Sequence, residues 1–581
     1  MKKLLIYLKD YKKECVLAPL FKMLEATFEL FVPLVVAAII DKGIANNDKR
    51  FIVSMAGILV LLAVIGLIWA ITAQYFAAKA AVGFATKIKH ALFDKIQSLS
   101  FSEIDRLGTS SMITRMTSDI NQVQSGVNLV LRLFLRSPFI VFGAMIMAFT
   151  IDIKEALIFV VTIPLLAIVV FGVMLASIPL YKKVQQCLDR VLGSTRENLT
   201  GIRVIRAFCR EESEIKSFDE KAKELNIMQK YVGKISALMN PITYIIINGA
   251  VIVLIWNGAI SVDAGILTQG QVVALYNYMS QILVELIKLA NLIINVTKAV
   301  SCGNRIQAIF EIESEQKTAV KPISESNMKK NGIYQDICVE FDHVGLTYKG
   351  AGDETLSDIT FTAKYGETIG VIGGTGSGKT SLVHMIPKFY DRTAGEIYID
   401  GKSIDTWSDE QLREKIGIVM QKAVLFQGTI RDNLLWGNEN ATDEQLYEAL
   451  EIAQAREVVD NKEGNLNAEV AQAGKNFSGG QKQRLTIARA LVKKPEILIL
   501  DDSASALDYA TDANLRRALK NREEKCCVFI VSQRTASIQQ ADKIIVLDDG
   551  KAVGIGTHEE LLETCEVYRE IYESQYSKEV Q

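Results

Sequence analysis

The sequence predicts an all-α domain of six membrane spans followed by an α/β domain. The 581 residues are 49% hydrophobic and have a positive mean hydropathy, but the long apolar runs fall almost entirely within residues 14–300. Residues 320–581 have the composition of an ordinary α/β domain and contain a strand–loop–helix pattern at 368–386. This uneven distribution indicates a membrane half fused to a cytosolic half.

Six apolar segments are each long enough to cross about 30 Å of hydrocarbon. They cover roughly residues 15–40, 51–78, 127–150, 156–180, 241–262 and 270–298. Lysine and arginine are concentrated in the N-terminus and in the long connections 79–126 and 181–240. Because positive residues stay on the cytosolic side, we expect the N-terminus, both long connections and the C-terminal domain in the cytosol.

The domain boundaries follow from these spans. We expect a transmembrane domain at 1–310 with two long cytosolic helical hairpins, a charged linker at 311–335 and a second domain at 336–581. The hairpins would reach roughly 35–45 Å beyond the membrane. Their tips, near Phe101–Ser110 and Gly201–Phe208, offer polar and apolar groups for docking on a soluble domain.

Charged residues fall inside the predicted spans, among them Lys22, Glu25, Glu29, Glu285 and Lys288. Charges in a membrane are costly and usually face a cavity or a partner. Two hypotheses stay open, a polar translocation path and ion pairs that fix helix packing. Neutralising Glu25 and Glu29 together should change substrate preference under the first hypothesis and only folding yield under the second.

Net charge, cysteine content and the first ten residues argue against nucleic-acid binding, disulfide bonds and a cleaved signal peptide. The net charge is −2, and nothing in the sequence suggests nucleic-acid binding. Eight cysteines form no C-x-x-C pair, so we expect free thiols without disulfides. The first ten residues are too polar for a cleaved signal peptide.

Val371–Ser381 contains the pattern G-x-x-x-x-G-K-[ST], preceded by an apolar strand and followed by a helix. Glycines let backbone amides curl around phosphate oxygens, and the helix directs its positive end at them. This stretch predicts a P-loop NTPase that binds ATP with Mg²⁺. Lys379 would reach the β- and γ-phosphates, and Thr380 would hold Mg²⁺. The other predicted ATP contacts in this loop are Gly373, Gly374, Thr375, Gly376, Ser377, Gly378 and Ser381.

Further residues fit the same site. Tyr348, at the end of a strand-like run, could stack on a base face. Gln421 ends the apolar strand 416–421 and could ligate Mg²⁺ and contact the attacking water. Ile497–Asp501 is a buried strand that ends in an acid, so Asp501 would hold Mg²⁺.

Asn476–Arg484 reads Asn-Phe-Ser-Gly-Gly-Gln-Lys-Gln-Arg and opens a helix. The Ser478 hydroxyl, the bare backbone at Gly479 and Gly480 and the helix N-terminus at Gln481 together predict an anion site. Ser505–Asp508 follows the acidic strand end.

Together, the phosphate-binding loop, Gln421, Ser478–Gln481, the Asp501 strand and Ser505–Asp508 behind six spans resemble an ABC exporter half-transporter. Thr114–Asp119 in the membrane half adds to the resemblance. The resemblance implies an ABC-type ATPase in which two halves pair and sandwich two ATPs head to tail. It implies that Ser478–Gln481 acts in trans on the partner's P-loop. It also implies that the tips near 101–116 and 201–208 are coupling helices, the second docking on the partner.

Two positions depart from the family pattern. The residue after Asp501 is normally a glutamate general base and here is Asp502, and the later histidine that contacts the γ-phosphate is replaced by Gln533. The shorter acid withdraws its carboxylate by about 1 Å, and misplacement on that scale can lower a rate about 100-fold. Gln533 can donate a hydrogen bond but cannot carry a positive charge. Gln472, where exporters often carry glutamate, is a milder difference.

This pattern resembles the degenerate-site subunit of bacterial heterodimeric multidrug exporters. We expect ATP-driven export of amphipathic molecules across the cytoplasmic membrane, with a different half-transporter as partner and lipid around the spans. Alternatives are a homodimer with two slow sites, a lipid or peptide exporter of the same build, and an ATP-gated channel or regulator. The sequence does not identify the substrate.

Overall fold

The computed structural model describes residues 1–312, 336–349, 351–522 and 525–576. Contacts divide the chain into two compact units, Met1–Ser98 with Gly108–Glu313 and Leu99–Leu107 with Ser314–Gln581. The predicted linker, 311–335, lies almost wholly outside the described residues.

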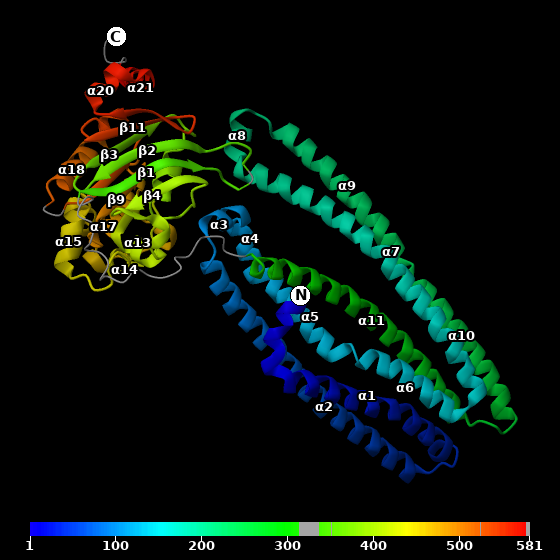
Figure 1. Ribbon diagram of the computed structural model, residues 1–581. Helices are drawn as coiled ribbons and strands as arrows, with labels where there is room; N and C mark the ends of the chain where they lie inside the picture. The colour runs from blue at the N-terminus through cyan, green and yellow to red at the C-terminus, as the bar shows by residue number, and fades with distance from the viewer. Residues whose placement is uncertain (313–335, 350, 523–524, 577–581) are drawn as a thin grey trace. The chain divides into compact units, whose positions relative to one another are not determined.

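The first unit is built from helices alone in its described residues (Figure 1). Its long helices are α1 (Lys12–Ala38), α2 (Lys49–Gln97), α5 (Ile120–Leu133), α6 (Arg136–Ile151), α7 (Ile153–Thr200), α9 (Glu211–Ala237), α10 (Met239–Asp263) and α11 (Gln269–Phe310). Shorter helical segments are η1 (Lys2–Tyr11), η2 (Ile39–Ile44), α4 (Thr109–Thr114), η3 (Arg115–Asp119) and α8 (Ile202–Ala207). Helix α1 packs along α2, α11 packs along α5 and α6, and α7 packs along α9 and α10.

Six helical stretches of the described residues are long and apolar enough to cross a membrane, which confirms the predicted number of spans. They are Lys3–Ile44, Lys49–Gln97, Thr109–Ile151, Ile153–Thr200, Glu211–Asp263 and Gln269–Phe310. The three short connections between them end in side-chain caps. Asp48, Asp152 and Thr268 each accept a hydrogen bond from a backbone N–H of the next helix, which satisfies a donor that the helix leaves unpaired.

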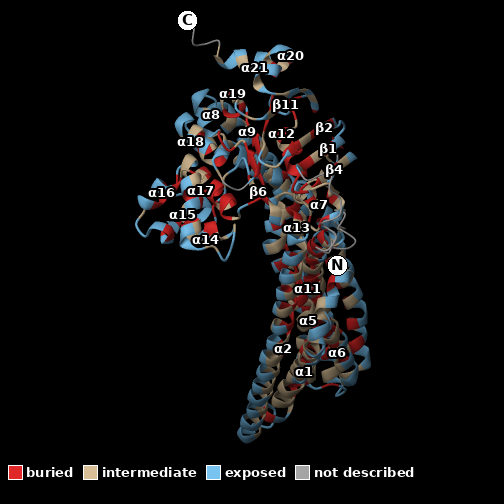
Figure 2. Ribbon diagram, turned by 60° about the vertical axis from the view of Figure 1, so that its left-hand side comes forward, coloured by how far each residue is buried: buried red, intermediate tan, exposed pale blue. Residues whose placement is uncertain are grey.

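Small residues let these helices approach closely. A Cβ on Gly126 of α5 would lie 2.3 Å from Cβ of Ala299 on α11, so only glycine fits there. Large apolar side chains remain exposed on these helices, for example Val60 of α2, Ile168 of α7 and Trp256 of α10. Much of the ribbon of α2 is coloured as exposed in Figure 2. Such faces suit contact with lipid or with a second subunit.

The second unit contains two sheets. Six strands lie in the order β12-β11-β3-β10-β9-β6, four lie in the order β2-β1-β4-β5, and β7 pairs with β8. Their bounds are β1 (Ile337–Leu346), β2 (Leu356–Lys364), β3 (Thr368–Gly373), β4 (Ala394–Ile399), β5 (Lys402–Ser403), β6 (Ile416–Val419), β7 (Gly428–Thr429), β8 (Glu469–Val470), β9 (Ile497–Asp501), β10 (Cys527–Val531), β11 (Lys543–Asp548) and β12 (Lys551–Gly556). Strands β6, β9, β10, β3 and β11 are parallel, and β12 is antiparallel to β11.

Two hydrophobic clusters cover the two faces of the six-stranded sheet. In β9, Ile497 and Ile499 belong to one cluster and Leu498 and Leu500 to the other. Successive strand residues point to opposite faces, so a continuous apolar run marks a strand that is buried on both sides. This explains why Ile497–Asp501 shows no polar alternation.

Helices of the second unit include α3, which comes from the membrane half of the sequence. The helices are α3 (Phe101–Leu107), α12 (Lys379–Met385), α13 (Asp409–Lys415), α14 (Ile430–Leu435), α15 (Asp443–Ile452), α16 (Arg456–Asp460), α17 (Gly479–Val492), α18 (Tyr509–Lys520), α19 (Thr535–Ile538), α20 (His558–Thr564) and α21 (Glu566–Tyr576). Single turns occur at η5 (Ile404–Thr406), η6 (Asn465–Asn467) and η7 (Gln472–Gly474). The α/β fold predicted for this half is confirmed.

Candidate functional site

The predicted phosphate-binding loop connects β3 to α12 at the carboxyl end of the parallel sheet. Its shape depends on glycine. A Cβ on Gly373 would lie 2.1 Å from the Leu547 carbonyl oxygen, and Gly378 has a φ of 93°, which other residues rarely adopt. The loop therefore turns tightly and packs its backbone close to neighbouring atoms such as the Leu547 carbonyl oxygen.

A cavity of about 250 Å³ lies against this loop. Most of the predicted nucleotide-contacting and hydrolytic residues meet in it, although they come from four separate parts of the sequence. It is lined by Thr355, Thr375, Gly376, Gly378, Lys379, Thr380, Ser381, Gln421, Asp501, Asp502, Val531, Ser532 and Gln533. The carboxyl ends of β3, β9 and β10 lie side by side, which brings these residues together.

Lys379 is buried at the base of the loop. Its Nζ donates to the carbonyl oxygens of Gly373 at 2.9 Å and Gly374 at 2.6 Å. Burial lowers the pKa of Lys379, an effect that the nearby Asp502 and Asp501 oppose. A phosphate in the cavity would offer this ammonium group a stronger acceptor than the two carbonyls.

The predicted Mg²⁺ ligands are close to one another. Thr380 Oγ1 donates to Asp501 Oδ1 at 3.0 Å, and Gln421 Nε2 donates to Asp502 Oδ2 at 3.2 Å. Asp501 Oδ2 is buried without a hydrogen-bond partner. These hydroxyl, carboxylate and amide oxygens are the hard ligands that Mg²⁺ prefers. The described residues contain no group of three or more His, Cys, Asp or Glu that could hold a metal, so phosphate oxygens and water would complete the coordination.

Sequence reasoning missed His384. Its Nε2 lies 3.3 Å from Asp501 Oδ2, and both atoms are buried without a hydrogen-bond partner among the described residues. The signal was available, because His384 follows Thr380 by four residues and therefore shares its face of α12. Rings of Phe389 and Tyr390 pack on the His384 ring.

Tyr348 lies beside the loop but outside this cavity. Its hydroxyl shares a hydrogen bond of 2.8 Å with Ser381 Oγ, and its ring meets Tyr390 edge-on. Burial raises the pKa of Tyr348. Tyr348 lines a separate cavity of about 260 Å³. Its stacking on a nucleotide base stays a prediction.

The helix start at Ser478–Gln481, predicted as a second anion site, lies outside the cavity. Ser478 caps α17, accepting from the Gln481 backbone N–H, while Gln481 accepts in return from Ser478 N. Ser478 and Gly479 are exposed, and no residue of Ser478–Gln481 lines the cavity. Asp508 caps α18 by accepting from the Thr511 N–H, and this hydrogen bond lowers the pKa of Asp508. An exposed, preorganised helix N-terminus is available to a ligand held by another chain.

The first predicted docking tip packs within the second unit. Phe101 of α3 stacks on Phe389 with ring centroids 4.1 Å apart, and the Tyr390 hydroxyl donates to Asp105 Oδ2 at 2.7 Å. The second tip contains α8 in the first unit, where Val204 and Phe208 are exposed. The coupling role of both tips stays a prediction.

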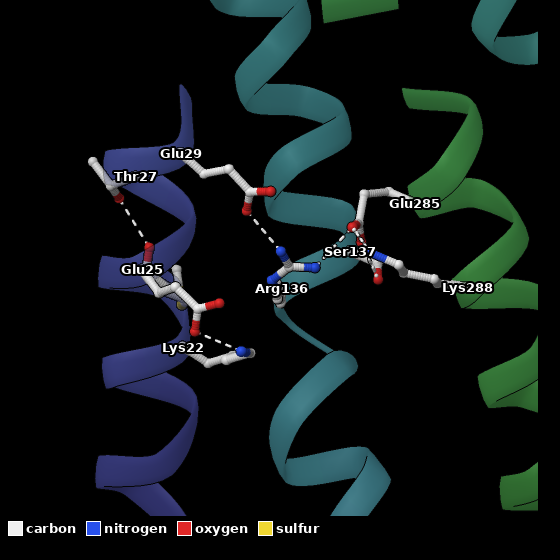
Figure 3. Close-up of polar contacts among 9 residues, drawn as sticks. Lys22, Glu25, Thr27, Glu29, Arg136, Ser137, Glu285 and Lys288 are labelled. Carbon is white, nitrogen blue, oxygen red and sulfur yellow. Dashed lines mark hydrogen bonds and ion pairs between the residues drawn. The ribbon is translucent and has the colours of Figure 1, made fainter. Parts of the chain in front are cut away.

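The charged residues of the spans form two clusters (Figure 3). Lys22 donates to Glu25 at 2.5 Å within α1. Arg136 of α6, which sequence reasoning did not select, donates to Glu29 of α1 at 2.6 Å and to Glu285 of α11 at 2.7 Å. Glu285 also accepts from Ser137 and Lys288, each at 2.8 Å. Ion pairs between helices therefore exist, and Glu29, Glu285 and Lys288 also line a cavity.

Comparisons with known proteins agree with this architecture. Residues 15–286 match the ABC transporter transmembrane region, and residues 356–505 match the ABC transporter family. YfiB of Bacillus subtilis (strain 168), described as an uncharacterized ABC transporter ATP-binding protein, is 35% identical over 100% of this chain and 99% of its own length. YgaD of the same organism, named as a candidate multidrug export ATP-binding/permease protein, is 31% identical over 99% of this chain and 98% of its own.

A solved structure shares the fold. A bacterial Atm1-family ABC exporter with ATP bound superposes with a TM-score of 0.79 over 97% of this chain and 99% of that chain, at 20% sequence identity. The chain thus belongs to the ABC transporter family, with the half-transporter arrangement of one transmembrane region fused to one ATPase domain. It is a multi-pass membrane protein whose ATP hydrolysis is coupled to transport.

Proposed function

We propose that this chain is the slow-site half of a heterodimeric exporter that moves amphipathic small molecules out across the cytoplasmic membrane by alternating access. Its N-terminus and ATPase domain would lie in the cytosol. ATP and Mg²⁺ would bind at Lys379, Thr380, Gln421 and Asp501, and hydrolysis would take place mainly at the partner's P-loop, which Ser478–Gln481 of this chain completes.

The observation that carries this proposal is the pairing of complete binding groups with altered hydrolytic groups in one cavity. Asp502 and Gln533 both line it, and Asp502 accepts a hydrogen bond from Gln421. A carboxylate that is one methylene short lies back from the position of an attacking water. An amide at Gln533 cannot supply the positive charge of an imidazolium.

The test restores both groups in the purified chain alone. Asp502→Glu with Gln533→His should raise ATP turnover about tenfold or more, because general-base groups contribute about 100-fold or more when correctly placed. Steady-state phosphate release measures turnover, and equilibrium binding of ATP should stay unchanged. Unchanged turnover in a variant that binds ATP normally would contradict the slow-site assignment.

Gln472→Glu provides the matched control. Gln472 also differs from the family pattern, but it is exposed and does not line the cavity. Its restoration should leave turnover unchanged. Transport itself is tested separately by ATP-dependent accumulation of amphipathic dyes in inverted membrane vesicles, since a channel or regulator would not accumulate a compound against its gradient.

A further inference from the structure

The cavity beside Glu29 and Lys288 has the composition of a binding site for an amphiphile. Its volume is about 410 Å³, within the usual range of small-molecule pockets. Its walls come from α1, α6 and α11. One part is apolar, with Val32, Pro33 and Ile140, and another part carries the polar side chains of Asn277, Ser280 and Gln281.

The charged residues at this cavity divide into a buried pair and an accessible pair. Arg136 and Glu285 have side chains only 8% and 4% exposed, and Arg136 donates to Glu285 at 2.7 Å. Glu29 and Lys288 have side chains 42% and 44% exposed. The buried pair holds α6 against α11, and the exposed pair is within reach of a ligand.

Both exposed groups have unused hydrogen-bonding capacity. Among the described residues, Glu29 pairs with Arg136 through Oε2 alone, so Oε1 can accept. Lys288 Nζ uses one of its three donors, on Glu285. Gln281 Oε1 is buried and accepts no hydrogen bond within the described part of the chain. The cavity therefore offers two acceptors and one cationic donor.

The net charge of the residues at this cavity narrows the class of ligand further. Glu29, Glu285, Arg136 and Lys288 sum to zero formal charge. A ligand with a net charge would bring an uncompensated charge into the membrane domain, which is costly. A ligand that carries both signs pairs with Glu29 and Lys288 and leaves the total at zero.

We infer that this cavity binds the head of a zwitterionic amphiphile, with a primary ammonium on Glu29 and Gln281 and an anionic phosphate or carboxylate on Lys288. The ammonium is primary because Gln281 Oε1 needs an N–H donor, which a quaternary ammonium lacks. The apolar wall takes the first part of the hydrocarbon chain. The ligand class rests on the proposed export function, and membrane lipid and a free amphiphile are both possible sources of this chemistry.

Four photoactivatable probes with one common acyl chain test the inference. Their heads are phosphoethanolamine, phosphocholine, methyl phosphate and a simple alkylamine. The full-length chain in its membranes, without nucleotide, is irradiated with each probe, and labelled peptides of α1, α6 and α11 are quantified by mass spectrometry. Phosphoethanolamine should label about fivefold more than the other three, since a charge-assisted hydrogen bond contributes about twice as much as a neutral one.

Two variants should shift the head-group preference in opposite directions. Glu29→Gln adds one net positive charge and should favour the methyl phosphate probe. Lys288→Gln adds one net negative charge and should favour the alkylamine. A purely structural role for these residues would change the amount of folded protein but not the order of the probes. Either variant alone suffices if the other does not fold.

The double variant Lys22→Gln with Glu25→Gln is the matched control. This pair lies on the same helix as Glu29, is also an ion pair and does not line the cavity. It should leave the order of probes unchanged. Equal labelling by all four probes, or preference for the alkylamine in the unaltered protein, would overturn the inference.

Separate measurements identify the source of the ligand and test the export function. Competition by unlabelled phosphatidylethanolamine vesicles indicates a lipid source, and competition only by soluble amino-phosphates indicates a free one. Selective labelling without ATP-dependent accumulation of any amphiphile would refute export but keep the site. Accumulation with unselective labelling would refute the site alone.

Discussion

Single side chains at the end of β9 decide how this subunit handles its nucleotide. Asp501 presents Oδ1 to Thr380 and Oδ2 to His384, so two residues of α12 face one carboxylate. Asp502 adopts a φ of 47°, a left-handed conformation that is uncommon for residues other than glycine. This backbone turns its carboxylate toward Gln421 and the cavity. Asp501, the predicted Mg²⁺ ligand, and Asp502, which replaces the usual general base, are therefore adjacent in sequence but face different neighbours.

We predict that His384 positions Asp501. Replacement by alanine removes the polar side chain whose Nε2 lies 3.3 Å from Oδ2, and losing a neighbour that orients a metal ligand typically lowers metal affinity about 10-fold to 100-fold. We expect His384→Ala to weaken Mn²⁺ binding in the presence of ATP about tenfold, measured by electron paramagnetic resonance of free Mn²⁺. ATP binding without metal should change little.

His343→Ala provides the control for this prediction, because His343 is exposed on β1, pairs with Asp358 and does not line the cavity. His384→Gln retains a donor and should recover part of the affinity. If the His384→Ala and His384→Gln variants bind Mn²⁺ as tightly as the unaltered chain does, His384 is only a packing residue.

At the scale of elements, the packing of α3 could not be predicted from its place in the sequence. It lies between α2 and α4 in the sequence but packs with the second unit. Two contacts hold it, the Phe101–Phe389 stack and the Tyr390–Asp105 hydrogen bond. Burial, together with Asp105, raises the pKa of Tyr390, so the tyrosine remains a neutral donor at physiological pH. Since Phe389 and Tyr390 also pack on His384, this contact adjoins the Asp501 site.

We predict that Tyr390→Phe weakens coupling between ATP hydrolysis and transport. The change keeps the ring against His384 and removes only the donor to Asp105, and a hydrogen bond to a charged group contributes about 1.5–3 kcal/mol before solvent screening. We expect the amount of dye transported per ATP hydrolysed to fall about threefold, with hydrolysis retained, in vesicles that also contain the partner subunit.

Tyr447→Phe is the control for coupling. The Tyr447 ring packs under Arg456 with the guanidinium 4.5 Å from its centroid, and phenylalanine preserves that contact away from α3. An unchanged transport-to-hydrolysis ratio in Tyr390→Phe would show that this hydrogen bond does not carry the coupling.

At the scale of the whole molecule, the P-loop cavity and the exposed helix start at Ser478–Gln481 are separate, since none of these four residues lines the cavity. Both features suit completion by a second chain. Exposed apolar side chains on α2, α7 and α10 likewise need lipid or another subunit. These features agree with the pairing of two halves that is general for such half-transporters.

We predict that ATPase activity depends on a second, different half-transporter. The purified chain alone should hydrolyse ATP very slowly, and co-expression with a half-transporter that carries the glutamate and histidine should raise turnover by about tenfold or more. Ser478→Ala in this chain should abolish that gain, because it removes the cap that completes the partner's site. Rapid hydrolysis by the single chain would contradict the asymmetric dimer.

The sequence by itself determined the six spans, the α/β class of the second half and the residues around the P-loop. Continuous apolar runs and a fixed glycine pattern depend on local physics, since hydrocarbon thickness and backbone freedom act on neighbouring residues. Tertiary structure alone decided that Arg136 joins Glu29 to Glu285, that α3 packs with the second unit, and that Tyr348 lies beside the phosphate cavity rather than in its lining. These contacts join residues far apart in the chain, and no local periodicity encodes which distant side chain will fill a given space.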